Sequence, residues 1–155
     1  MSRLRTFGKG DPVSAIADSA WRALILVTAP ANQRGVIEKW GVTARGVVNS
    51  DKPIKVRLIR ASDAGTGGSA KTAGKKNTNF SETPQMVYTH NFSTSPTPTG
   101  EPLDESVIHP QQGGQGVCLE RGEWELAGGE RAMVQYMNDG GTASIPLSGK
   151  LDVEE

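Results

Sequence analysis

Ile54-Lys55-Val56-Arg57-Leu58 and Leu147-Ser148-Gly149-Lys150-Leu151-Asp152-Val153 are the stretches that decide the fold of this chain. Apolar and polar residues alternate in both, and Ile145 extends the second pattern. Because successive side chains of a strand point to opposite faces, each stretch turns one apolar edge toward a core. The chain also has 19 glycines and nine prolines, which fall between the apolar runs where turns are expected. We therefore predict an all-β, single-domain β-sandwich or jelly roll of about eight strands.

The length of 155 residues suits one domain, which we place at residues 20–155. Residues 1–19 are poor in large apolar side chains, and we predict an extended N-terminal arm there. A short helix over Pro12–Ala20 is the alternative for the end of the arm, since apolar residues recur there at helical spacing. Within the domain, residues 62–79 are rich in Gly, Ala, Ser, Thr and Lys, which predicts a flexible loop.

The charges of the chain balance, with 17 basic and 17 acidic residues. This balance argues against nucleic acid and against a membrane as partners. The longest apolar run, Ala23–Val27, is too short for a membrane span, and no signal peptide is visible. A soluble protein made in the cytoplasm is expected. The single cysteine, Cys118, cannot form an internal disulfide, and we expect it to be a small buried hydrophobic residue.

Residues that could carry catalysis or bind metal are few and scattered. His90 and His109 have no second ligand at the short spacing of local metal sites, and no Gly-x-Ser-x-Gly motif is present. The glycine pairs are not followed by the residues of a phosphate loop. We therefore predict no catalytic, cofactor or metal site and no enzymatic activity. Two acidic clusters are expected on exposed strand faces; they are Glu120, Glu123 and Glu125, and Asp152, Glu154 and Glu155.

Several short segments together resemble a family of small structural proteins encoded by tailed bacteriophages. They are Val27–Arg34, Glu38–Val42, Ile54–Arg60, His109–Gln111, Gly128–Arg131 and Glu154-Glu155. The resemblance covers about residues 20–155 and implies a β-rich head or tail component of the virion without enzymatic activity. The arm before Trp21 and the segment Ser62–Thr78 are longer than this family pattern.

The arm suggests where such a protein would bind. Arg3, Arg5, Phe7 and Lys9 combine cationic and aromatic anchors of the kind that dominate protein interfaces. Our first hypothesis is a capsid decoration, or cement, protein that uses these residues to bind the major capsid protein. Such a protein would lie on the head surface of the virion, as a homo-oligomer and most simply a trimer.

Two other hypotheses remain open. The same chain could be a neck, tail or fibre-attachment protein, which a label at one vertex of the head would distinguish from decoration. It could also be a carbohydrate- or receptor-binding module that uses exposed rings among Trp21, Trp40 and Trp124. Burial of all three tryptophans would argue against that module.

Overall fold

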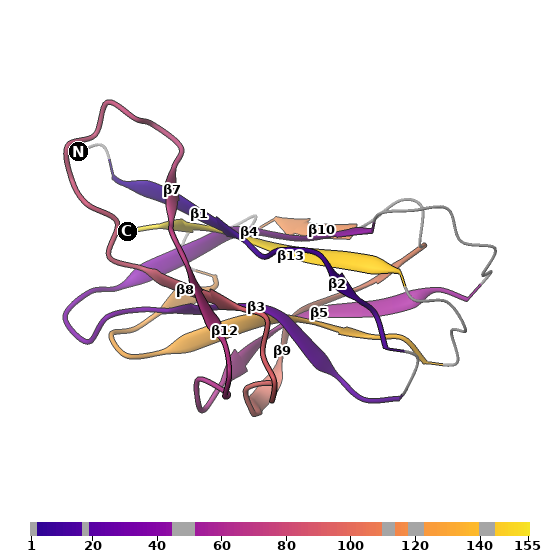
Figure 1. Ribbon diagram of the computed structural model, residues 1–155. Helices are drawn as coiled ribbons and strands as arrows, with labels where there is room; N and C mark the ends of the chain where they lie inside the picture. Colours follow the sequence, from indigo (N-terminus) through magenta and orange to yellow (C-terminus); the bar gives the residue numbers. More distant parts are fainter. Residues whose placement is uncertain (1–2, 17–18, 45–51, 110–113, 118–122, 140–144) are drawn as a thin grey trace.

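The structure is a computed structural model that describes residues 3–16, 19–44, 52–109, 114–117, 123–139 and 145–155. These residues form thirteen β-strands and no helix. The strands make two antiparallel sheets that lie face to face, as Figure 1 shows. The prediction of an all-β, sandwich-like fold is therefore confirmed.

Sheet A contains seven strands in the order β10-β4-β13-β1-β7, with β11 beside β4 and β2 beside β13. Its strands are β1 (Arg5–Lys9), β2 (Val13–Ser14), β4 (Gly35–Ala44), β7 (Gly74–Lys75), β10 (Gly114–Val117), β11 (Glu125–Leu126) and β13 (Pro146–Glu154). Sheet B contains six strands in the order β6-β8-β3-β12-β5-β9. Its strands are β3 (Arg22–Thr28), β5 (Ile54–Ala61), β6 (Ser69–Lys71), β8 (Val87–His90), β9 (Pro98–Ile108) and β12 (Arg131–Met137).

The two alternating stretches of the sequence form opposite walls of the core. In β5 the side chains of Ile54, Val56 and Leu58 are fully buried, and from sheet A Leu151 and Val153 of β13 are fully buried as well. Full burial of each such side chain stabilises the fold by about 1.5–3 kcal/mol. The period of two in the sequence thus translates directly into the layer between the sheets.

A bulge in β4 changes which of its residues face outward. Asp152 and Val153 are consecutive in β13, but their partners in β4 are Lys39 and Ile37. Glu38 is therefore an extra residue in β4 with no partner in β13. Ile37 and Trp40 on either side are buried in the core, while Glu38 and Lys39 are only half-buried. The bulge therefore places two consecutive charged side chains on the outer side of sheet A.

The predicted N-terminal arm is instead part of sheet A. β1 pairs with β13 along its whole length and with β7 on its other edge, so no domain boundary falls at residue 19. The alternative of a helix over Pro12–Ala20 is also wrong, because Val13–Ser14 is a strand beside β13; residues 17 and 18 lie outside the described residues. The arm needs few apolar residues of its own because the ring of Tyr88 packs directly on Gly8.

The predicted flexible loop at residues 62–79 contains β6 and β7 and crosses from sheet B to sheet A. The ring of Phe7 lies against Gly74, where an added Cβ would come within 2.4 Å of Phe7 Cζ. The apolar side chain that holds this segment in place is therefore Phe7 of β1, so the segment does not need large apolar residues of its own. The strands in the expected arm and loop raise the count above the eight predicted.

A chain of hydrogen bonds, buried at its centre, connects the two sheets. The Tyr88 hydroxyl of β8 donates to Thr6 Oγ1 of β1 at 3.1 Å, and Thr6 in turn donates to Glu155 Oε1 at 2.9 Å. The same Glu155 carboxylate accepts the backbone N–H groups of Gln85 at 2.8 Å and Met86 at 3.3 Å. The first strand, the last described residue and the segment before β8 are thus held by one polar chain.

Candidate partner-binding surface

The four residues predicted to contact a partner lie together on the outer face of sheet A. Arg5, Phe7 and Lys9 alternate on the outer side of β1, whereas Thr6 between them is buried. Arg3 reaches the same face, because its Nη1 lies 3.3 Å from Glu154 Oε1 of β13. The structure therefore brings the four residues together, with Arg5, Phe7 and Lys9 on the paired strand β1 and Arg3 just before it, and not on an extended arm.

Three lysines that the sequence analysis missed complete this surface. Lys39 of β4 lies directly opposite Asp152, and Lys76 Nζ lies 2.9 Å from Asp152 Oδ2. Lys150 of β13 lies 3.3 Å from the same carboxylate. The polar phase of the alternation in β13 could have indicated Lys150, but no sequence signal indicated the other two. We call this surface the basic face; its members are Arg3, Arg5, Phe7, Lys9, Glu38, Lys39, Lys76, Lys150, Asp152 and Glu154.

The carboxylates of the basic face are covered by cations. Asp152 was expected to be exposed, yet it is only 2% exposed because Lys76 and Lys150 lie over it. Glu154 is similarly covered, with Arg5 Nη2 at 3.5 Å. Arg5 also lies 3.2 Å from Glu38 Oε1. The expectation of exposed acidic residues is therefore wrong here, since each carboxylate is paired with cations that cover it.

Positive charge remains in excess on this face. Lys9 and Lys150 lie directly opposite each other on neighbouring strands, an arrangement that destabilises a sheet because like charges repel. Among the described residues, no carboxylate lies within ion-pair distance of Lys9. Lys150 Nζ is also 5.4 Å from the centroid of the Phe7 ring. The whole chain has no net charge, so this excess of cations is a local property of the basic face.

His90 has a structural environment. It is 3% exposed, and its Nδ1 accepts the backbone N–H of Asp11 at 3.2 Å. A hydrogen bond from Lys71, at 2.6 Å, lowers the pKa of the Asp11 carboxyl. No group of three or more metal-ligating side chains occurs in the parts of the chain that the structure describes. Cys118 lies outside the described residues.

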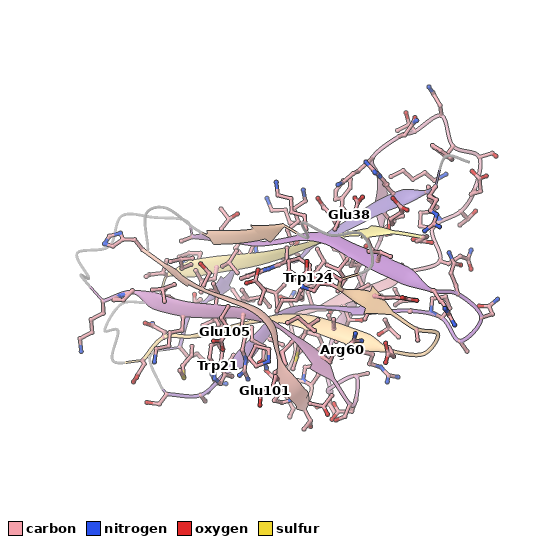
Figure 2. The ribbon with its side chains drawn as sticks, turned by 180° about the vertical axis from the view of Figure 1, so that it is seen from behind. Trp21, Glu38, Arg60, Glu101, Glu105 and Trp124 are labelled. Carbon is pink, nitrogen blue, oxygen red and sulfur yellow. The ribbon has the colours of Figure 1, made fainter. Side chains whose placement is uncertain are left out.

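The three tryptophans differ in exposure. Trp40 is 1% and Trp124 5% exposed, and Trp40 Nε1 donates across the sandwich to Asp104 Oδ2 of β9 at 2.8 Å. Trp21 is half-buried, just before β3. Figure 2 shows Trp124 between the sheets, Trp21 and Glu105 toward the outer side of sheet B, and Glu38 on the opposite side of the molecule. A carbohydrate-binding surface built on tryptophan would therefore depend on Trp21.

Comparisons with protein-family models, with curated proteins and with solved structures found no match to this chain. Among the described residues, no helix has the length and apolar character needed to cross a membrane. The functional assignment therefore depends on the sequence resemblance and on the geometry of the basic face.

Proposed function

We propose that this chain is a bacteriophage virion structural protein, without enzymatic activity, that binds the outside of the assembled head as a decoration protein. The observation that carries the proposal is the excess of cations on the basic face, where Lys9, which has no carboxylate within ion-pair distance among the described residues, lies opposite Lys150 and near Phe7. A repulsive pair reduces the stability of the free protein, so its presence favours a role in binding. The resemblance of the sequence to small phage structural proteins supports the same conclusion.

The basic face suits attachment to a preassembled shell. Most of its side chains lie on β1, β4 and β13, which are central strands of sheet A, so binding does not require the ordering of a flexible segment. Arg5 and Phe7 supply the anchors, and an acidic patch on the major capsid protein is the complementary partner. A homo-oligomer, most simply a trimer, would present several basic faces at once and strengthen weak individual contacts.

Point substitutions test the proposal, because deletion of the N-terminal residues would remove β1 and disturb the fold. We expect Lys9→Glu to weaken co-sedimentation with undecorated heads by roughly tenfold or more, equivalent to about 1.4 kcal/mol. The control is Arg34→Glu, which makes the same change in charge at a side chain that is 78% exposed, pairs with Glu125 and is not a member of the basic face. Binding should also weaken as salt concentration rises. Equal binding of both variants would contradict the proposal.

The position on the particle needs a separate experiment. Immunogold labelling of complete virions should place the protein over the whole head. A label confined to one vertex would instead support the neck, tail or fibre-attachment hypothesis.

A further inference from the structure

The outer face of sheet B is covered in one half and open in the other. In the covered half Leu26, Ile59 and Met133 form a second small apolar cluster, and Phe92 packs against it. These three side chains are at most 2% exposed. In the other half the residues near the start of β5 and the end of β9 have no such cover: Lys55, Glu105 and Val107 are exposed. Val107 is 60% exposed.

The open half contains a groove of about 440 Å³. It is lined by Trp21, Lys55, Val56, Glu105, Ser106, Val107 and Met137. Val107, Lys55 and Met137 form one row across β9, β5 and β12, because each is the register partner of the next. Val56 and Ser106 fall in the opposite phase of their strands, so we infer that their main chain forms the floor of the groove. The volume lies in the range of small-ligand sites.

Arg57 holds the aromatic wall of this groove in place. Its guanidinium carbon lies 4.0 Å from the centroid of the Trp21 ring, a close cation–π contact. Its Nε donates to Gln135 Oε1 of the neighbouring strand at 2.9 Å. Glu105 lies opposite Arg57 on β9. The orientation of Trp21 is therefore fixed before any ligand arrives.

We propose that this groove binds an oligosaccharide that carries a carboxylate group. A sugar ring has an apolar face of C–H groups, which suits Trp21 and Val107, and a rim of hydroxyl groups, which suits the Glu105 carboxylate. The ammonium group of Lys55 has no carboxylate within ion-pair distance among the described residues. A carboxylate on the ligand supplies that missing partner.

This assignment is independent of attachment to the head. The groove and the basic face lie on the outer faces of opposite sheets, so both surfaces can be occupied together. A protein bound to the shell through sheet A would turn the groove toward the surroundings of the virion.

The test uses the purified full-length chain and a printed array of acidic oligosaccharides with their neutral counterparts. We expect binding to acidic members, with at least roughly tenfold weaker binding by Trp21→Ala, from the loss of ring stacking. Val107→Asp places a negative charge in the groove and should abolish binding. The matched control is Val87→Asp, the same change at a valine that is 50% exposed on β8, outside the groove, and should bind normally.

Three results would overturn the assignment: no binding on the array, equal binding of neutral and acidic members, or unchanged binding by Val107→Asp. Because Val107 is exposed, its substitution remains informative if Trp21→Ala does not fold. Binding is measured in the absence of phage particles, so failure here leaves the decoration proposal intact. Loss of particle attachment in Lys9→Glu with normal array binding would separate the two functions.

Discussion

The substitution Gly8→Ala tests whether β1 is a built-in strand of the sandwich. An added Cβ at Gly8 would lie 2.1 Å from Cδ1 and 2.3 Å from Cγ of Tyr88. The ring cannot move aside easily, since Tyr88 is fully buried and its hydroxyl is bonded to Thr6 at 3.1 Å. Relief must therefore come from displacement of β1 itself.

The expected cost follows from the overlap. Forcing one extra methyl group into a packed core costs about 1–3 kcal/mol, and two ring atoms within 2.3 Å place Gly8→Ala at the upper end of that range. For a domain of this size, about 3 kcal/mol corresponds to a decrease in melting temperature of about 6–12 °C. The neighbouring exposed substitution Lys9→Ala should change stability by about 0.5 kcal/mol or less.

Thermal unfolding and urea unfolding of the single and double variants supply the assay. Tyr88→Ala removes the ring that an added Cβ at Gly8 would meet. In that background Gly8→Ala should therefore lower the free energy of unfolding much less than it does in the native chain. A melting temperature of Gly8→Ala close to that of the native protein would refute the packing described here. An equal cost in both backgrounds would show that the destabilisation does not come from Tyr88.

Three further predictions concern polar contacts. Burial raises the pKa of Tyr88, because the folded state favours the neutral phenol. This preference contributes fully to the free energy of unfolding below the unfolded-state pKa of about 10, and the contribution is lost as pH rises further. Tyr88→Phe should reduce the fall in melting temperature above pH 10 and cost about 1 kcal/mol at neutral pH through the lost bond to Thr6. Glu155→Gln should destabilise the fold by about 1–2 kcal/mol and speed hydrogen exchange at the Gln85 amide, whereas unchanged exchange would contradict that contact. Hydrogen bonds from Thr97 and Gly65 lower the pKa of Asp63. The ionised carboxylate therefore stabilises the fold above the unfolded-state pKa of about 3.9, and this stabilisation is lost as pH falls through the lower pKa of the folded state. Asp63→Asn should remove that part of the acid sensitivity in melting curves.

The main walls of the core could be predicted because their signal is local. Ile54, Val56 and Leu58 repeat at the period of a strand, and Leu151 and Val153 do the same. All five residues belong to one buried apolar cluster, so periodicity alone identified both strands and the fold class.

β1 and the segment with β6 and β7 could not be predicted in this way. The inward positions of β1 are occupied by the small residues Thr6 and Gly8, because the ring of Tyr88 fills the space beside them. Its aromatic residue, Phe7, points outward onto Gly74. The apolar surface that orders these segments belongs to residues far away in sequence, and local composition therefore indicated an arm and a loop.

The basic face was predicted in part. The composition of the first residues indicated Arg3, Arg5, Phe7 and Lys9 as binding residues, and the structure groups them on one face. The role of Lys150 depends on the register between the first and last strands, which no local pattern encodes.

Attachment to the head through the basic face is tested most directly by a cryo-electron microscopy reconstruction of virions that contain this protein. We expect density for the sandwich over the whole head surface, with the outer face of sheet A and Lys9 against the capsid. Density at a single vertex, or sheet B turned toward the shell, would contradict it.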